Sequence, residues 1–172
     1  RRLTLPTLSR LAFDALLAVP LAGGRITQTH AWLHLPEHRV LLAAADRDLW
    51  LTLKPLLDAS PYAPPRVRDV AKATGIAEDS VRLLFKRIAR HGDAWPVAPD
   101  HYFTAEAVAD LAHRVAALNA SEGCARAAPL RDQIGGGRKV AIHILEFFDR
   151  IGYTRRVRDT HVLRGSPEQF GS

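Results

Sequence analysis

The carboxyl-terminal part of the sequence places basic side chains in two clusters. Arg138 and Lys139 follow a run of glycines, and Arg155, Arg156 and Arg158 form the second cluster. Guanidinium and ammonium groups donate hydrogen bonds that pair well with phosphate oxygens. The chemistry that these residue types favour is therefore the binding of a polyanion, not a covalent reaction.

The net charge of +6 is unevenly distributed along the chain. Residues 125–165 contain nine basic and four acidic side chains, a net charge of +5, which leaves only +1 for all the other residues. A local excess of positive charge attracts nucleic acids and other polyanions. We therefore expect a polyanionic partner to bind the carboxyl-terminal end of the chain.

An internal repeat indicates which elements position these cations. Residues 75–92 and 135–152 both begin and end with glycine, are offset by 60 positions, and carry apolar residues at helical spacing. The apolar positions are Val81, Leu84, Phe85 and Ile88 in one copy and Ala141, Ile144, Leu145 and Phe148 in the other. Shorter helical stretches, 66–73 and 129–133, precede the two copies. The pattern predicts two helix-turn-helix units whose long helices end at glycine.

A short run that is compatible with a β-hairpin follows each helix-turn-helix. These runs are 95–103 and 153–164, the second with a turn near Arg158 and Asp159. A helix-turn-helix followed by a hairpin is the plan of a winged helix. The predicted fold is therefore mainly α with short β-hairpins, arranged as tandem winged-helix domains.

The repeat also predicts the domain boundaries. A weaker copy, offset by 68 positions, carries Phe13, Leu16 and Leu17 on its apolar face and ends at Gly24, with its wing at 26–35. We expect a truncated winged-helix unit at 1–43, a complete one at 44–121 and a third at 122–172. The middle unit should open with a helix over 46–58 and close with a connecting helix over 104–119. The missing amino-terminal helices and the absence of methionine indicate a piece of a longer chain.

Comparison of the two complete copies predicts which one binds. The long helix of the middle copy starts with Glu78 and Asp79, whereas that of the last copy starts with Arg138 and Lys139. In the wing, Trp95, Pro96 and Ala98 are replaced by Arg155, Arg156 and Arg158. Because exposed N–H groups at a helix start already favour anions, added cations strengthen that preference. We expect RNA or DNA at the last unit, and not merely a solvated charged surface.

Other kinds of site find little support in the sequence. Cys124 is the only cysteine, which excludes an intramolecular disulfide and a cysteine-rich zinc site. His30, His34 and His38 lack nearby carboxylate pairs, so we expect no metal site there. The run at 135–139 is not a phosphate-binding loop, because its spacing differs and Val140 stands where that motif needs a hydroxyl. No serine occupies a nucleophile turn, so we expect neither catalysis nor a cofactor.

Two further expectations concern the rest of the surface and the compartment. Arg82, Lys86 and Arg90 form a stripe along the middle helix that indicates a solvated surface, with contact to ribosome or tRNA as the alternative. No apolar run approaches the roughly 18 residues that span a bilayer. We expect a soluble, cytoplasmic protein without membrane contact.

Residues 131–157 read RDQIGGGRKVAIHILEFFDRIGYTRRV. This stretch resembles the carboxyl-terminal end of the bacterial selenocysteine-specific elongation factor. The family pattern is a glycine turn, Gly-Arg-Lys, an Ile-Leu-Glu-(Phe/Tyr)-Phe-Asp-Arg-Ile-Gly core and an arginine-rich wing, found here at 137–139, 144–152 and 154–156. Upstream, 31–38 resembles the family's Trp-Leu-His-Leu-Pro wing and 67–72 its Val-Arg-Asp-Leu-Ala. The three glycines at 135–137 exceed the family pattern.

This resemblance implies an mRNA-binding arm of a selenocysteine-specific translation elongation factor. Such an arm binds the selenocysteine-insertion stem-loop in mRNA beside an in-frame UGA codon, and thereby tethers the GTPase and its selenocysteyl-tRNA on the ribosome. GTP and Mg would belong to the amino-terminal part of the factor. For this fragment the resemblance implies a monomer that is not itself an enzyme and has no cofactor of its own.

RNA loops are recognised through backbone shape and unstacked bases, which gives the candidate residues different roles. We assign Arg138, Lys139, Arg155, Arg156 and Arg158 to the loop backbone, and Arg131, Gln133 and His143 to an extruded base. One alternative is a winged-helix transcription regulator that binds duplex DNA. Another is a structural or protein-binding scaffold. If the chain prefers a stem-loop to duplex DNA, the mRNA-binding interpretation is favoured over the transcription regulator. If binding to nucleic acid does not depend on salt, the scaffold is favoured.

Overall fold

The computed structural model describes residues 9–29, 32–37 and 41–170, and the chain divides into two compact units, Arg1–Arg39 and Val40–Ser172. The described residues form helices and short antiparallel hairpins, each hairpin made of two strands. This confirms the predicted fold class, mainly α with short β-hairpins. The two units are described separately below.

The first unit contains one described helix followed by a hairpin. Helix α1 (Arg10–Ala22) begins after Ser9, whose Oγ accepts a hydrogen bond from the Ala12 amide at 3.2 Å. Strand β1 (Thr27–Thr29) pairs antiparallel with β2 (Trp32–His34), as the predicted wing requires. Leu16, however, is 60% exposed, because the described part of the unit contains little that could cover that face of α1.

Several residues discussed in the sequence analysis fall outside the described part of the chain. They are His30 and His38 of the rejected metal site and Ala31 of the family-like wing. Among the described residues, no group of three or more histidine, cysteine or acidic side chains is arranged to hold a metal ion.

The middle winged helix begins the second unit. Its elements are α2 (Ala44–Asp58), α3 (Val67–Thr74), α4 (Glu78–His91), β3 (Ala94–Ala98), β4 (His101–Thr104) and α5 (Ala105–Glu122). Gly75, with φ of 72°, makes the tight turn between α3 and α4 in a backbone conformation that other residues adopt at a cost. The four apolar residues predicted on α4 are all buried, and they pack with Trp50, Leu53 and Leu57 of α2.

The last winged helix repeats this plan in a shorter form. It consists of α6 (Ala127–Ile134), α7 (Arg138–Ile151), β5 (Thr154–Val157), β6 (Thr160–Leu163) and a closing 3-10 helix, η1 (Pro167–Phe170). The four apolar residues predicted on α7 are fully buried. The turn of the wing falls at Arg158 and Asp159 as predicted, and Arg158 has a φ of 55°.

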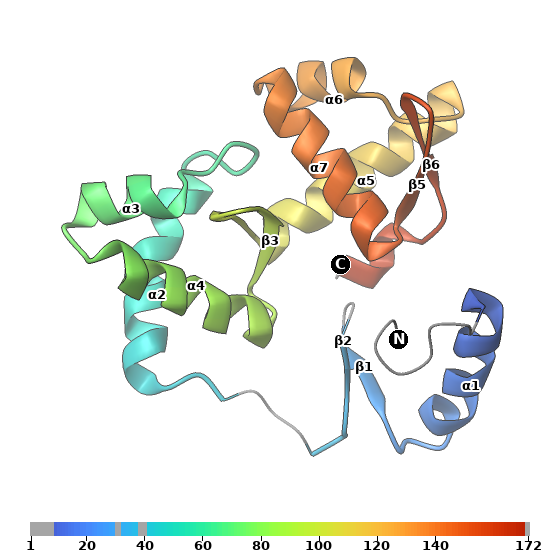
Figure 1. Ribbon diagram of the computed structural model, residues 1–172, viewed down its shortest axis with the longest axis horizontal. Coiled ribbons are helices and arrows are strands. Elements are labelled where there is room, and N and C mark those ends of the chain that lie inside the picture. The colour runs from blue at the N-terminus through green and yellow to red at the C-terminus, as the bar shows by residue number, and fades with distance from the viewer. Residues whose placement is uncertain (1–8, 30–31, 38–40, 171–172) are drawn as a thin grey trace. The chain divides into compact units, whose positions relative to one another are not determined.

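One of the two hydrophobic clusters of this unit joins the middle hairpin to α5 and the last winged helix, and the helices α2, α3 and α4 form the other. Trp95, Val97 and Phe103 of the middle hairpin belong to the same buried cluster as Phe147 and Phe148 of α7. The two elements lie side by side in Figure 1, over the long helix α5. The boundary predicted between 121 and 122 lies at the end of α5, which Gly123 caps.

Polar contacts reinforce this joint at two places. The Arg150 guanidinium on α7 donates to the backbone oxygens of Pro96 and Val97 at 2.9 and 3.1 Å. On the other side, Arg114 of α5 donates to the hydroxyl of Tyr62, before α3, at 3.0 Å and to the backbone oxygen of Gln133 in α6 at 3.4 Å. Both sets of bonds fix the orientation of the last winged helix on the middle one.

The closing 3-10 helix was not predicted from the sequence. It brings Phe170 into the shared core, where 2% of the residue is exposed and its ring centroid lies 5.0 Å from that of Tyr153 and 5.8 Å from that of Trp95. Edge contacts between aromatic rings at such distances add to the burial of apolar area. The end of the chain therefore contacts both winged helices.

We predict that Phe170→Ala lowers the free energy of unfolding by about 3 kcal/mol, the usual cost of removing a buried phenyl ring. Because the core is shared, hydrogen-exchange protection should fall in β3 and β4 as well as in α7. Exchange measured by NMR checks both halves, with the exposed neighbour Gln169→Ala as the control. A loss of protection limited to residues 127–163 would show that the cores unfold independently.

His101 is a buried histidine in this second unit. Its Nε2 lies 2.8 Å from the backbone oxygen of Pro64, and its Nδ1 is buried without a partner. Burial lowers the pKa of His101 below its usual value of 6.5, since the charged imidazolium loses hydration there. The neutral ring with a proton on Nε2 satisfies the bond to Pro64.

We predict that His101 makes the fold less stable in acid. Because the folded pKa is lower than the unfolded one, its contribution is fully present above pH 6.5 and is lost as the pH falls, by at most about 1.4 kcal/mol per pH unit. Urea unfolding at pH 7.5 and 5.5 should show a larger loss for the parent than for His101→Gln, which keeps a donor for Pro64. Equal losses would contradict this role.

Candidate nucleic-acid interface

The start of helix α7 carries two of the predicted cations. Gly137 caps the helix without any side-chain hydrogen bond, and the first turn contains no acidic residue. Arg138 and Lys139 are both exposed there. Free N–H groups, the helix dipole and two cationic side chains therefore act on the same side, and together they favour an anionic ligand.

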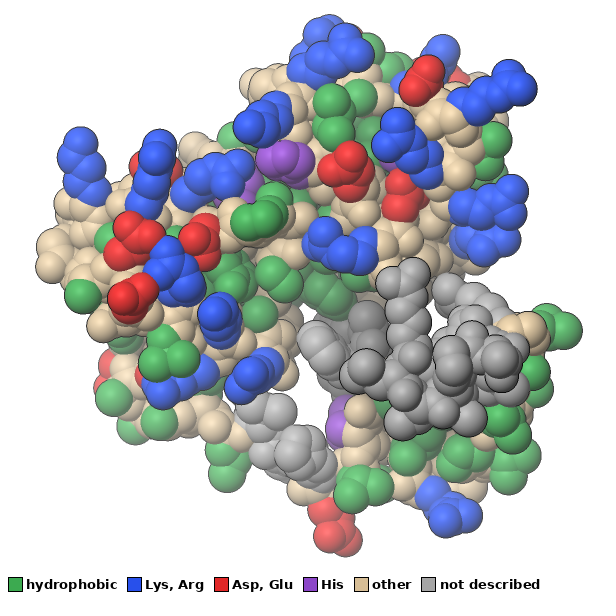
Figure 2. Space-filling view, viewed as in Figure 1, with side chains coloured by type: hydrophobic (Ala, Val, Ile, Leu, Met, Phe, Trp, Pro, Cys, Tyr) green, Lys and Arg blue, Asp and Glu red, His purple; other side chains and the backbone are tan. Residues whose placement is uncertain are grey.

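The corresponding end of α4 is neutralised within the protein. The guanidinium of Arg82 pairs with the carboxylates of Glu78, Asp79 and Asp100, the last at 2.9 Å. The hydrogen bond to Asp100 raises the pKa of Arg82, and the same bond lowers the pKa of Asp100. Figure 2 shows cationic and acidic side chains mixed over α4. This part of the middle stripe is engaged in internal ion pairs.

The wings of the two copies face different surroundings. In the middle copy Trp95 and Val97 are buried in the shared core, whereas in β5 only Thr154 is buried and Arg155 and Arg156 are exposed. Arg155 pairs with Val162 and Arg156 with His161. Because side chains alternate across a strand, these two arginines point to opposite faces of the hairpin.

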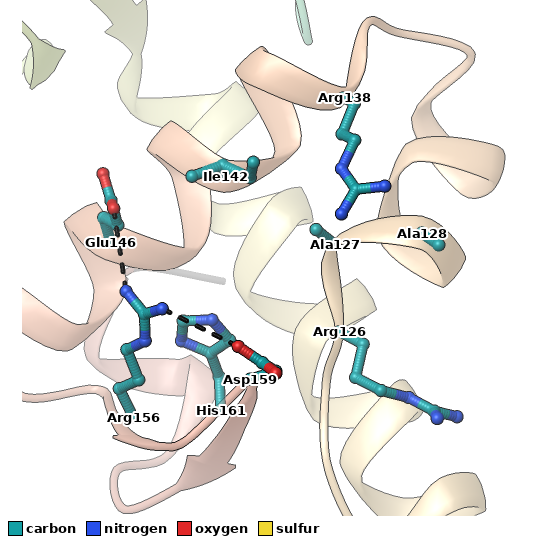
Figure 3. Close-up of a pocket in the computed structure, with 9 residues that line it drawn as sticks. All are labelled: Arg126, Ala127, Ala128, Arg138, Ile142, Glu146, Arg156, Asp159 and His161. Atoms are coloured by element: carbon teal, nitrogen blue, oxygen red, sulfur yellow. Dashed lines mark ion pairs between the residues drawn. The ribbon is translucent and has the colours of Figure 1, made fainter.

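A pocket of about 420 Å³ lies where α6, α7 and the inner face of this wing meet (Figure 3). Its lining residues are Arg126, Ala127, Ala128, Arg138, Ile142, Glu146, Arg156, Asp159 and His161. Arg138 reaches from α7 toward the start of α6, and Arg156 lies between two carboxylates at 4.0 Å from each. The pocket thus combines cationic side chains with an apolar wall of Ala127, Ala128 and Ile142.

The structure brings together only part of the predicted site. Arg138 and Arg156 line the pocket, while Lys139, Arg155 and Arg158 are exposed on the same two elements outside its lining. Lys and Arg side chains gather over α7 and the β5–β6 hairpin in Figure 2. All five residues assigned to the loop backbone therefore belong to one region, which consists of the α7 start and the wing.

The three residues assigned to a base lie elsewhere. Arg131 pairs with its neighbour Asp132 at 2.6 Å, and Gln133 is exposed on α6. His143, on α7, has a buried Nδ1 without a partner. None of the three lines the pocket, so their contact with a base stays a prediction.

Seven of the nine lining residues were not among the predicted site residues, and Arg126 and His161 are the two basic side chains among the seven. Arg126 immediately precedes α6 and pairs with Glu122 at 2.7 Å, so its guanidinium projects away from the centre of the pocket. His161 is paired with Asp149 at 2.8 Å. The predicted turn at Arg158 and Asp159 already implied that His161 stands opposite Arg156, and this signal could have identified it.

No helix in the described part of the chain is long and apolar enough to cross a membrane.

The chemistry that the arrangement permits is the binding of a phosphate-rich ligand by donors from one helix start and one hairpin. The carboxylates of Glu146 and Asp159 lie on either side of the Arg156 guanidinium, each at 4.0 Å.

Comparison with known proteins gives the same family from several directions. The family described as "Elongation factor SelB, winged helix" matches residues 117–163. The selenocysteine-specific elongation factor of Escherichia coli is 36% identical over 164 residues, which are 95% of this chain and 26% of that protein. The Haemophilus influenzae protein of the same description is 29% identical over 84% of this chain and 23% of its own length. The chain thus spans about a quarter of these relatives.

A solved structure extends the comparison to three dimensions. It is described as the structure of the mRNA-binding domain of elongation factor SelB from E. coli in complex with SECIS RNA. The TM-score is 0.65 and the sequence identity 35%, over 72% of this chain and the whole of that one. Because it has tandem winged helices and matches the whole chain of that solved structure, this chain belongs to the selenocysteine-specific elongation factor (SelB) family and corresponds to its carboxyl-terminal winged-helix region.

Proposed function

We propose that this chain is the mRNA-binding arm of a selenocysteine-specific elongation factor, and that its last winged helix binds the selenocysteine-insertion stem-loop. The observation that carries the proposal is the match with the SECIS RNA complex, in which the whole of the relative's chain is covered at 35% identity. The cations at the start of α7 and on the wing give this binding a physical basis, because both elements are exposed and both are basic.

The distribution of charge supports binding at the last unit and not at the middle one. The start of α7 lacks acidic residues, whereas the start of α4 is occupied by an ion-pair network around Arg82. The middle wing is buried in the shared core and has no free face for RNA at Trp95 or Val97. The middle winged helix then serves as a rigid support for the last one.

The role of the whole factor extends this proposal beyond the fragment. A GTPase in another part of the factor, with GTP and Mg, would hold selenocysteyl-tRNA, and the ribosome would be its further partner. Binding of the arm to an mRNA hairpin raises the effective concentration of the loaded factor near the UGA codon. The fragment itself would act as a monomer in the cytoplasm, without catalysis and without a cofactor of its own.

Binding of the 172-residue chain to RNA is the direct test. We predict that a labelled selenocysteine-insertion hairpin binds more tightly than the same stem with a scrambled loop, and more tightly than duplex DNA. If about five phosphates are contacted, affinity should fall by about 10²- to 10³-fold between 50 and 200 mM salt. Fluorescence anisotropy at both salt concentrations measures this. Equal binding of hairpin and duplex DNA would overturn the proposal.

We further predict that Arg138→Glu with Lys139→Glu reduces hairpin affinity by about 100-fold or more, because two charge-assisted contacts are replaced by repulsion. The matched control is Lys86→Glu with Arg90→Glu, which makes the same change in net charge on exposed positions of α4. The control should stay within a few-fold of the parent at the same salt concentration. Equal losses of affinity in the two variants would mean that net charge alone causes the effect, and α7 would then not belong to the interface.

A further inference from the structure

His161 has a titratable side chain and lines the pocket, but it is not among the residues assigned to RNA binding. Its residue is 7% exposed, and its Nδ1 lies 2.8 Å from Oδ2 of Asp149. The other carboxylate oxygen of Asp149 accepts a hydrogen bond from the hydroxyl of Thr154 at 2.7 Å. The ring is thus held by a carboxylate that is itself held in place.

The backbone of His161 is fixed as well. Its N–H donates to the oxygen of Ala125, and its oxygen accepts from the Ala125 amide, both at 2.9 Å. On the other side it stands directly opposite Arg156 in the hairpin register. The imidazole therefore has little freedom to turn, and it lines the pocket in a fixed orientation beside the arginine (Figure 3).

This orientation decides what the ring can bind. A proton on Nδ1 satisfies Asp149, so in the neutral ring the Nε2 atom carries a lone pair and only accepts hydrogen bonds. Phosphate oxygens also only accept. A phosphate can therefore bond to Nε2 only when that atom is protonated.

The charged groups around the ring balance one another. Three carboxylates and three guanidiniums face it or line the same pocket: Asp149, Glu146 and Arg138 from α7, Arg156 from β5, Asp159 from the turn, and Arg126 from the start of α6. Protonation of His161 adds one positive charge to this balanced set. A phosphate that binds between His161 and Arg156 offsets the added charge and pairs with both side chains.

We propose that His161 takes up a proton when the pocket receives an RNA phosphate, so that His161, Arg138 and Arg156 bind the phosphate together while Asp149 positions the ring. The inference rests on the proposed function and deepens it, because it names the group of the RNA that the pocket receives. Affinity for the hairpin is then linked to pH: each binding event consumes up to one proton, so binding tightens as the pH falls.

The test is the affinity of the chain for the selenocysteine-insertion hairpin at pH 6.0, 7.0 and 8.0 at constant ionic strength. We expect the parent to bind about fivefold more tightly at pH 6.0 than at pH 8.0, within the tenfold per pH unit that uptake of one proton permits. His161→Gln keeps a polar group that can donate at every pH, so its affinity should be nearly independent of pH. The exposed His113→Gln, on α5, should behave like the parent.

A second readout counts the protons directly. Calorimetric titration at pH 7.0 in two buffers of different ionisation enthalpy should show proton uptake on binding by the parent and by His113→Gln, and none by His161→Gln. Thermal melting of each variant verifies that the fold is retained. A purely structural role of His161 would change stability without changing the number of protons taken up.

The outcomes separate this inference from the proposed function. If the parent does not prefer the hairpin over the scrambled loop at any pH, the proposed function fails. If it does prefer the hairpin and His161→Gln has the same pH dependence as the parent, the proton-linked role of His161 is overturned. Tighter binding by the parent at higher pH would also overturn it, since Nε2 would then accept a bond from a ribose hydroxyl or a base.

Discussion

The packing of the middle wing against helix α7 is the contact on which the rest of the second unit depends. Trp95 and Val97 are buried there, and Arg150 donates to the backbone of the same strand. A wing that is exposed on both faces would leave the last winged helix connected only through α5. With the wing buried, one hydrophobic cluster spans the middle hairpin and the last domain, and the candidate site on the last domain has a fixed orientation relative to the middle one.

The two copies of one plan also differ in charge at the start of their long helices. At the start of α4 the guanidinium of Arg82 pairs with the surrounding carboxylates. At the start of α7 the charge is opposite, and Arg138 lines the pocket beside the exposed wing. A difference of a few side chains therefore reverses the charge of this end without any change in the backbone plan.

Most of the secondary structure could be predicted because it is local: helical spacing of apolar residues and terminal glycines determined both long helices. The shared cluster could not be predicted. Trp95 was interpreted only as the counterpart of Arg155 in the repeat, whereas its burial depends on α7, about 50 residues farther along the chain. The basic residues Arg138 and Arg156 of the pocket were predicted from the distribution of charge alone. His161 was missed because its importance arises from Asp149 of α7, which approaches it only when the hairpin packs against that helix.

The buried wing gives this joint a direction. The β3–β4 hairpin of the middle domain is the surface on which the next domain packs, so the face that carries Trp95 and Val97 is closed to a ligand. A joint of this kind extends the chain by one domain without adding a second exposed hairpin. Reach and valency are thereby uncoupled at this joint.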